Sequence, residues 1–476
     1  MITPQNLQPF PMQFQENLLK MLGEKETSSL LNALTLPPIT SLRINPFKTD
    51  TNTTLGENVK WCKEGHYVDS SQSFTFDPKF HSGAYYVQEA SSMFLEQWVK
   101  TYVSSPSLCL DFCSAPGGKC THLLSLLPKG SFVVANEPIA SRASILVENL
   151  SKWGAPNVMI TQSFPEEFEG IQPIFDVILT DVPCSGEGMF RKNTEAVQQW
   201  SMQNVHLCME RQRKILAQAW KLLKPNGVLI YSTCTFNCFE NEEIMEWIVK
   251  EYGAEILPLS PEESWGMWHG IGEHSLGYHL FPHLVKGEGL YMCALRKPDV
   301  GNSSNPSFAP RRKTKSNSSN KEISLSEKDY FMGNGESMLR IERGDTAYWV
   351  KSQWKELYEY LSEHLKILQV GIPTSIRKGN LWILHPALAL STELNRGHFE
   401  CIDLNLKDSL SYLRGESVPY DGNMSKGYVL ITYRSFSLGW AKRVGNRLNN
   451  LYPPMWRIKS THLPSEEIFP MLLYKE

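Results

Sequence analysis

Between residues 106 and 297, short apolar runs alternate with longer segments in which hydrophobic residues recur at helical spacing. The apolar runs are expected strands, at 108–113, 131–137, 157–161, 175–183 and 227–234. The intervening segments are expected helices, at 123–127, 141–154, 205–224 and 240–253. The run at 175–183 is too apolar to alternate, which is typical of a strand covered on both faces. Strands that alternate with helices predict a parallel, doubly wound α/β sheet.

Glycine and proline mark where two of these helices should end. Gly154 is a good C-cap for the helix at 141–154. Pro225 and Gly227 should stop the long helix at 205–224. After the last helix, the apolar runs HLFPHLV and LYMCALRK lie on either side of Gly287-Glu288-Gly289 and predict a terminal antiparallel hairpin.

The chain on either side of this segment has a different character. Residues 1–105 are expected to form an α+β region that opens with an amphipathic segment around 14–22. Residues 298–322 are dominated by Ser, Asn and Pro and predict a flexible linker. Residues 323–476 are expected to form a second, smaller, β-rich region with strands at 379–385 and 427–433. The 476-residue length fits two to four domains.

Composition narrows the function classes. Apolar residues make up 41% of the chain and charged residues 20%, which is enough to bury a sizeable core. With 47 basic and 50 acidic residues, the net charge is −3, so any nucleic-acid binding requires local basic patches. No export signal and no apolar run of membrane-spanning length are present, which predicts a cytosolic protein.

The ten cysteines show no C-x-x-C pair and no neighbouring histidine cluster. In a cytosolic chain they are expected to be reduced thiols. Without a zinc-binding spacing we expect no metal site.

The segment Asp111–Lys119, DFCSAPGGK, joins an expected strand to an expected helix. Its small residues allow close backbone approach to a ligand, and the helix start offers free N–H groups. Glu137 ends the next strand, where an acid can accept hydrogen bonds from ribose hydroxyls. The segment matches neither G-x-G-x-x-G nor the P-loop pattern. A nucleoside without a long phosphate chain fits better, which points to S-adenosylmethionine.

Two cysteines follow adjacent expected strands, Cys184 in DVPCSG and Cys234 in STCT. Ligands of such sheets bind outside the carboxyl ends of the strands, so both thiols should reach the same site as the Gly-Gly turn. Thiols suit cytosine methylation, because a thiolate that adds to carbon 6 makes carbon 5 nucleophilic. A carboxylic acid near nitrogen 3 would stabilise the developing charge, and a base must remove the hydrogen of carbon 5.

The motifs DFCSAPGGK, DVPCSGEGMFRK and YSTCT resemble those of the Sun-type RNA cytosine-C5 methyltransferases. SLRIN (41–45) and YYVQEASSM (85–93) extend the resemblance upstream, and GWAKRVGNRLNNLYPP (439–454) is similar to the C-terminal module of the bacterial 16S ribosomal RNA methyltransferase F branch. The resemblance implies a Rossmann-like fold, S-adenosylmethionine as cofactor, RNA-binding flanking regions and a PUA-like C-terminal region.

The resemblance also implies roles for individual residues. Cys234 would be the nucleophile and Cys184 would assist breakdown of the covalent adduct, with Asp181 in the same catalytic group. The cofactor contacts would be Cys113, Ser114, Ala115, Pro116, Gly117, Gly118, Lys119, Glu137 and Asp181. The Pro183-Cys184 pair leaves the opposite assignment open, because DNA cytosine methyltransferases use a nucleophilic Cys that follows Pro.

Two positions depart from the family pattern. Val182 stands where the family usually has Ala, next to Cys184. Phe164 stands where the family often has an Asp near the adenine. We expect backbone groups or Gln162 to hold the adenine instead.

Residues 422–465 carry basic residues and no acidic one. The basic residues are Lys426, Arg434, Lys442, Arg443, Arg447, Arg457 and Lys459, with six aromatic residues interleaved. Basic groups bind phosphates and aromatic rings can stack on unpaired bases, although most of these rings should belong to a small β-rich core. Phe190-Arg191-Lys192 could contact phosphates beside the target base or form an ordinary exposed loop.

The sequence therefore predicts a monomeric enzyme that makes 5-methylcytosine in ribosomal RNA of the small subunit. A transfer RNA methyltransferase with the same chemistry is the nearest alternative. A non-catalytic ribosome-assembly factor is disfavoured by the presence of both Cys184 and Cys234, and a small-molecule methyltransferase by the basic C-terminal segment.

Overall fold

The structure, a computed structural model, describes residues 10–53, 55–69, 73–271, 276–299, 301, 325–335, 337–418, 427–444, 447–460, 464, 466–469 and 472–475. All but three residues of the predicted linker 298–322 lie outside the described residues. No described helix is long and apolar enough to cross a membrane.

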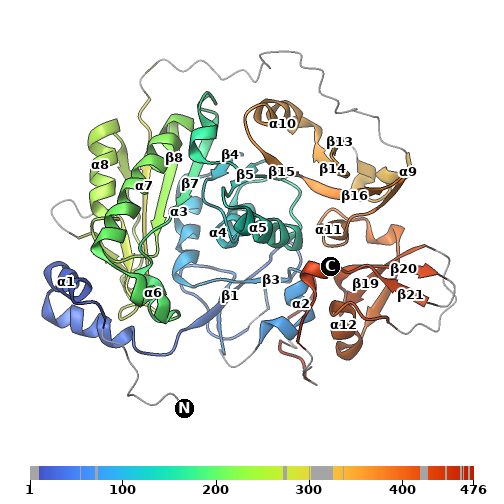
Figure 1. Ribbon diagram of the computed structural model, residues 1–476, viewed down its shortest axis with the longest axis horizontal. Helices are drawn as coiled ribbons and strands as arrows, with labels where there is room; N and C mark the ends of the chain where they lie inside the picture. Colours follow the sequence, from blue (N-terminus) through green and yellow to red (C-terminus); the bar gives the residue numbers. More distant parts are fainter. Residues whose placement is uncertain are drawn as a thin grey trace.

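A parallel sheet forms the centre of the molecule (Figure 1). Its strands are β4 (Leu108–Asp111), β5 (Phe132–Asn136), β6 (Val158–Thr161), β7 (Phe175–Asp181) and β8 (Leu223–Thr233). They are adjacent in the order β8-β7-β4-β5-β6, and each neighbouring pair is parallel. Because the order reverses direction beside β4, the predicted doubly wound sheet is confirmed.

Helices cover both faces of this sheet (Figure 1). The helices are α3 (Leu95–Tyr102), α4 (Gly118–Leu126), α5 (Ala140–Trp153), α7 (Met202–Leu222) and α8 (Glu242–Tyr252), whereas the short helix α6 (Thr194–Gln199) packs in a separate apolar cluster. Leu110 and Ile178 pack with α7 and α8 in one apolar cluster, whereas Cys109 and Val177 pack with α3, α4 and α5 in another. Adjacent strand residues therefore face opposite layers, which explains why the sequence of these strands does not alternate.

The helix ends follow the sequence signals. Gly154 caps α5 in the left-handed conformation with φ 82°, as predicted. Helix α7 ends at Leu222, before Pro225, and β8 begins directly after it, four residues earlier than expected.

Antiparallel strands extend the sheet at both edges. Beyond β8 lie β12 (Leu290–Arg296), β11 (Tyr278–Leu280) and β10 (Trp268–His269), and β9 (Glu255–Leu257) also pairs with β12. Strands β11 and β12 confirm the predicted terminal hairpin. At the other edge, β15 (Ile367–Val370) pairs with β6. The sequence pattern did not predict that a strand from the region after residue 323 would complete this sheet.

The N-terminal region combines helices with a small antiparallel sheet. Its elements are α1 (Met12–Ala33), β1 (Thr40–Ile44), β2 (Gly65–Val68), α2 (Pro78–His81) and β3 (Tyr85–Val87), with the strand order β2-β1-β3. Phe14 and Leu18 of α1 are buried against Phe190 and Trp200, beside the loop that follows β7. The predicted amphipathic opening segment therefore packs beside the central domain.

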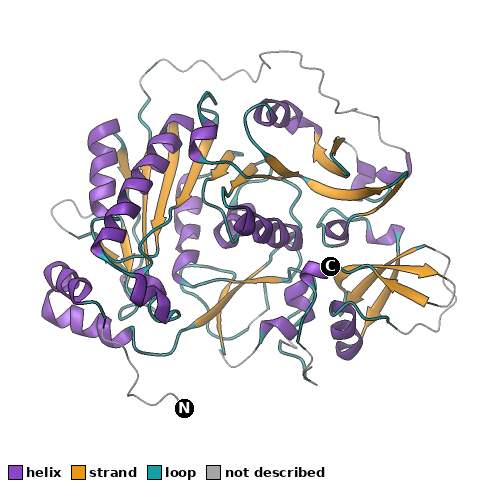
Figure 2. Ribbon diagram, in the orientation of Figure 1, coloured by secondary structure: helices purple, strands orange, loops and turns teal. Residues whose placement is uncertain are grey.

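The C-terminal part contains two further sheets (Figure 2). The first has the order β13-β14-β16-β17, from β13 (Met338–Arg343), β14 (Thr346–Lys351), β16 (Ile372–Lys378) and β17 (Leu381–Leu384). The second has the order β18-β19-β20-β21, from β18 (Glu400–Leu404), β19 (Tyr428–Tyr433), β20 (Phe436–Val444) and β21 (Arg447–Asn450). The α-helices among the described residues of this part are α9 (Leu325–Lys328), α10 (Lys355–Ser362), α11 (Pro386–Ala389) and α12 (Leu406–Leu413).

The end of the chain packs against its beginning. Tyr474 pairs with Thr49 in an isolated β-bridge, and Phe469 lies in one apolar cluster with Tyr85 and Leu42. Lys79 of α2 is fully buried and forms an ion pair of 3.0 Å with Glu467. The N-terminal and C-terminal regions are therefore packed together on one side of the molecule.

Candidate active site

A cavity of about 660 Å³ opens at the carboxyl ends of β4, β7 and β8. Its lining includes the turn after β4, the residues after β7 and β8, and segments that follow β3 and precede β12. Of the residues singled out from the sequence, it includes Cys113, Ser114, Ala115, Pro116, Gly118, Lys119, Asp181, Cys184 and Cys234. The structure therefore brings the predicted cofactor turn and both predicted thiols to one cavity.

The turn between β4 and α4 is fixed by the elements behind it. Its hydrogen bonds run from Ser114 N to Asn136 O (2.8 Å), from Arg142 Nη2 to Ala115 O (2.9 Å) and from Asn149 Nδ2 to Pro116 O (2.8 Å). Gly117 precedes α4 with φ 111°, a conformation that residues with an L side chain rarely adopt and that glycine adopts readily. A Cβ at Gly118 would lie 3.3 Å from the Tyr86 ring, so a side chain at this position would crowd the part of the cavity lining that Tyr86 forms.

Asp181, the last residue of β7, is held in place by two partners. Lys119 Nζ lies 2.9 Å from Asp181 Oδ1, and Ser232 Oγ donates to the same oxygen at 2.7 Å. Burial opposes the charge of Lys119, but the Asp181 carboxylate raises the pKa of Lys119 above its ordinary value. The lysine of the turn is therefore a fixed cation that orients the carboxylate on the neighbouring strand.

Asp111 is a buried acid that we did not select as a site residue. Burial raises its pKa to about 7, and Ser114 Oγ donates to its Oδ2 at 2.9 Å. The acid lines the cavity at the end of β4. Its position before the small-residue turn was the available sequence signal.

Glu137 does not lie on the lining of this cavity as defined by the described residues. Its side chain is buried, with Oε1 accepting from Ile139 N at 3.0 Å and Oε2 lying 3.4 Å from Arg142 Nη2. The acid stands directly after β5, as the sequence predicted, but its carboxylate is engaged by the start of α5.

The two thiols approach each other closely. Because β7 and β8 are parallel neighbours with Asp181 opposite Ser232, the residues just beyond their ends lie together. Cys184 Sγ is 3.2 Å from Cys234 Sγ, and both side chains are half-buried on the cavity lining. The hydrogen bond with Cys234, together with burial, raises the pKa of the Cys184 thiol well above its ordinary value. The pairing of β7 with β8 therefore brings both thiols to one point of the cavity.

A buried polar network supports the loops that carry these thiols. Glu240 accepts from Ser185 N, Gln212 Nε2 and Asn237 Nδ2, each at 2.9 Å, and also from Ser185 Oγ. Glu187 accepts from Phe236 N and from Asn237 N at 3.0 Å, and from Trp200 Nε1 at 3.0 Å. Each carboxylate therefore links the loop after Cys184 to the loop after Cys234.

We did not predict this network from the sequence. The available signal was a set of polar residues inside otherwise apolar surroundings, in SGEG (185–188) and FNCFE (236–240). No spacing rule connects the two segments, because they meet only when β7 and β8 pair.

The upstream motifs pack behind the cofactor turn. Arg43 of SLRIN is buried and donates to Gln88 Oε1 at 2.8 Å and to Thr121 Oγ1 at 2.7 Å. Its Nη2 also lies 3.3 Å from Gly118 O, at the start of α4. Both N-terminal motifs therefore support the helix that begins at the cofactor turn.

The basic residues that follow the Cys184 loop differ in whether they could contact an RNA phosphate. Arg191 is buried, lies 3.6 Å from Glu288 Oε2 and donates to Ala33 O, and Phe190 is buried against α1. The interpretation of Phe190-Arg191-Lys192 as a group that contacts phosphates is therefore wrong for the first two residues. Lys192 alone of the three lines the cavity.

The C-terminal aromatic residues belong mostly to the core, as expected. Tyr433, Phe436, Trp440, Tyr452 and Trp456 are buried. Among the basic residues of this segment, Lys442 and Lys459 are exposed, whereas Arg434 forms a 2.7 Å ion pair with Glu467. Lys426 lies outside the described residues.

Three family models match the chain in succession. Residues 10–90 match the N-terminal domain of 16S rRNA methyltransferase RsmF, residues 103–296 match 16S rRNA methyltransferase RsmB/F, and residues 399–458 match the methyltransferase RsmF PUA domain. The three models follow one another in the order of the N-terminal region, the central sheet and the β18–β21 sheet.

Curated relatives match this chain over most of its length. Ribosomal RNA small subunit methyltransferase F of Erwinia tasmaniensis is 28% identical over 470 residues, covering 93% of this chain and 96% of the relative. The protein of the same name from Cronobacter sakazakii is 30% identical over 438 residues, covering 87% and 89%. A solved methyltransferase homologue from Pyrococcus horikoshii is 25% identical with a TM-score of 0.52, covering 60% of this chain and 95% of its own.

Proposed function

Since the chain belongs to the RsmB/F family of 16S rRNA methyltransferases, we propose that it methylates carbon 5 of a cytosine in 16S ribosomal RNA with S-adenosylmethionine as methyl donor. The proposal has its strongest support in one observation. Two thiols lie 3.2 Å apart in the cavity that also contains the small-residue turn at 113–119. A thiol nucleophile beside a methyl donor is what carbon-5 methylation of cytosine requires.

The residues of the cavity fit S-adenosylmethionine. Its volume of about 660 Å³ lies in the usual range for small-molecule and cofactor sites. Gly118 keeps the wall clear of side-chain atoms, and the N–H groups at the start of α4 suit the carboxylate of the methionine moiety. Asp111 and Asp181 supply carboxyl oxygens on the cavity lining for the polar groups of the cofactor. When bound, the cofactor supplies the methyl group.

Within this proposal, Cys234 is the nucleophile. Its thiolate sulfur bonds to carbon 6 of the cytosine, which moves electron density to carbon 5. The proton that the Cys234 thiol gives up passes to nitrogen 3, so the negative charge does not stay on the ring. The N–H at nitrogen 3 donates to Asp181, which is fixed by Lys119 and Ser232. After methylation, a base takes the hydrogen of carbon 5 as a proton, the double bond between carbons 5 and 6 re-forms, and the bond to Cys234 breaks.

Cys184 assists this last step. Its sulfur lies 3.2 Å from that of Cys234, next to the position of the covalent adduct. The attack is assigned to Cys234 because STCT resembles the motif that carries the nucleophile in the Sun-type family. The target base has to leave its stack to reach this cavity.

The substrate is tested by bisulfite sequencing of ribosomal and transfer RNA from cells with and without the gene. Loss of one protected cytosine in 16S rRNA is the expected result. Loss of a protected cytosine in transfer RNA instead would favour the alternative substrate, and an unchanged pattern in both would leave the non-catalytic assembly factor. Acting on 16S rRNA would place the protein in the cytoplasm.

A further inference from the structure

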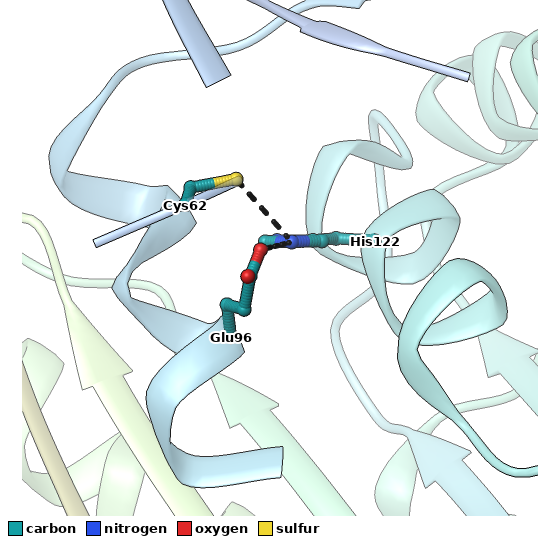
Figure 3. Close-up of side chains that lie close together, drawn as sticks. All are labelled: Cys62, Glu96 and His122. Carbon is teal, nitrogen blue, oxygen red and sulfur yellow. Dashed lines mark hydrogen bonds and ion pairs between the residues drawn. The ribbon is translucent and has the colours of Figure 1, made fainter. Parts of the chain in front are cut away.

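Cys62, Glu96 and His122 bring a thiol, a carboxylate and an imidazole together (Figure 3), and none of the three lines the cavity of the candidate active site. Cys62 precedes β2, Glu96 lies on α3 and His122 lies on α4. All three side chains are buried, and their ligand atoms lie within 4.8 Å of one another. Cys62 and Glu96 are 60 and 26 positions from His122, so no sequence motif announces the cluster.

The three side chains converge on one point. Cys62 Sγ lies 3.8 Å from His122 Nε2, and Glu96 Oε2 lies 3.3 Å from the same nitrogen. Tetrahedral zinc, with bonds of about 2.3 Å to sulfur and about 2.0–2.2 Å to nitrogen and oxygen, gives sulfur–nitrogen and nitrogen–oxygen edges of about 3.6 Å and about 3.4 Å. We propose that Cys62, Glu96 and His122 form a structural binding site for a thiophilic divalent cation, with Zn²⁺ as the ion that best matches the donor set.

The charges around the cluster suit a divalent cation. A thiolate and a carboxylate neutralise the two charges of Zn²⁺, while the imidazole adds none. The second oxygen of Glu96 is occupied, because Oε1 accepts from Lys63 N at 3.3 Å and from Lys100 Nζ. This leaves Oε2 as the single oxygen directed at the cluster, which is how an outer hydrogen bond orients a ligating carboxylate.

The imidazole is also ready to bind a cation. Its Nε2 faces both Cys62 Sγ and Glu96 Oε2, so the nitrogen that would bind the cation is directed at the other two ligand atoms. His122 Nδ1 has no hydrogen-bond partner among the described residues, so only groups at Nε2 fix the ring.

The position of the cluster suggests what the cation would do. Cys62 belongs to the N-terminal region, whereas His122 lies on the helix that begins at the cofactor turn. One residue before His122, Thr121 accepts a hydrogen bond from Arg43 of β1. A bound cation would therefore join the N-terminal region to α4 next to an existing link, and would hold the helix start that carries Gly118 and Lys119.

The test measures cation binding to the full-length chain. The protein is stripped with a chelator, titrated with ZnCl₂ and analysed by elemental mass spectrometry after dialysis. We expect one tightly bound zinc per chain, and Co²⁺ in its place should show a thiolate-to-cobalt charge-transfer band and tetrahedral visible bands. Cys62→Ser and Glu96→Gln should each weaken zinc binding by at least roughly 10- to 100-fold. Zinc should raise the melting temperature of the wild type but not of these variants.

Matched variants separate this site from the other thiols. Cys293→Ser changes a buried cysteine elsewhere in the sheet and should leave binding unchanged. If the double variant Cys184→Ser/Cys234→Ser loses the cobalt band while Cys62→Ser keeps it, the cation binds at the catalytic thiols and the proposal is wrong. Wild-type protein that retains no zinc after dialysis and shows no cobalt–thiolate band also overturns it, whether or not the variants fold.

Discussion

The cavity of the central domain and the sheet β18–β21 bury different kinds of residue. In the central domain the buried groups include carboxylates and amides: Asp111 lines the cavity, and Glu187, Asn237 and Glu240 support the loops that carry Cys184 and Cys234. In the sheet β18–β21 the buried side chains are mainly apolar and aromatic, and the cations Lys442 and Lys459 are exposed.

This difference separates two ways of acting on RNA. Buried polar groups are costly unless every partner is present, so the cavity is sensitive to the loss of single atoms. Exposed cations act on phosphates through additive, salt-screened attraction, so each of them matters little alone. We therefore expect single substitutions to abolish function in the first region and to change affinity only slightly in the second.

The largest expected effect comes from the thiols. Cys234→Ala should abolish methylation and leave no covalent RNA complex, because no nucleophile remains to attack carbon 6. Cys184→Ala should still attack and methylate but release slowly, so a denaturant-resistant protein–RNA complex should accumulate. Denaturing gel electrophoresis with labelled RNA distinguishes the two variants, and Cys208→Ala on α7 serves as a control. A trapped complex with Cys234→Ala and none with Cys184→Ala would reverse the two roles.

Loss of the Glu240 carboxylate from the polar network should have the next largest effect, which is on the stability of the fold. Glu240→Gln puts an amide group in place of a carboxylate that accepts from Ser185, Gln212 and Asn237. Each buried donor left without an acceptor costs about 1–3 kcal/mol, so the free energy of unfolding should fall by about 2–5 kcal/mol. Urea denaturation measures this change. Glu243→Gln, at an exposed position one turn along, should change it by less than about 0.5 kcal/mol.

If both variants have the same stability, the network does not stabilise the thiol loops. The central region would then tolerate change as the C-terminal region does, and the contrast between them would fail.

The central sheet could be predicted from the sequence because its signals are local. The strands from β4 to β8 are short apolar runs, and residues such as Gly154 stop the helices where the chain turns. The proximity of Cys184 and Cys234 could also be predicted, because the carboxyl ends of adjacent parallel strands meet at one edge of a sheet.

Contacts between distant segments could not be predicted in this way. Strand β15 joins the sheet beside β6 after about two hundred intervening residues, and no pattern in Ile367–Val370 specifies its partner. Glu187, Glu240 and the cluster of Cys62, Glu96 and His122 likewise become neighbours only through tertiary packing. The burial of Arg191 against Glu288 overturned a role that its sequence position had suggested.

Glu137 provides a smaller test of the central region. Glu137→Ala removes the acid expected to bind the ribose hydroxyls, and hydrogen bonds to a charged acceptor contribute about 1.5–3 kcal/mol. The dissociation constant for S-adenosylmethionine should therefore rise roughly 10- to 150-fold, as measured by calorimetry. Glu148→Ala removes a half-buried acid of α5 that pairs with Lys152 and should leave binding unchanged. Equal affinity in wild type and Glu137→Ala would mean that Glu137 serves only to fix Arg142 and the start of α5.

The smallest expected effect lies in the C-terminal region. Lys442 is exposed on β20 with its ammonium 5.3 Å from the Tyr428 ring, and Lys459 is exposed beyond β21. If each binds one phosphate of single-stranded RNA, removing both with Lys442→Ala and Lys459→Ala should reduce the slope of log affinity against log salt by about 1.4, at about 0.7 per contact. Methylation at saturating RNA should be unchanged, because neither lysine lines the cavity. Lys129→Ala removes an exposed cation just before β5, at the end of the central sheet that lies opposite the cavity, and should not alter the slope. An unchanged slope in the double variant, or an equal change with Lys129→Ala, would show that the charge of this region does not act through local phosphate contacts.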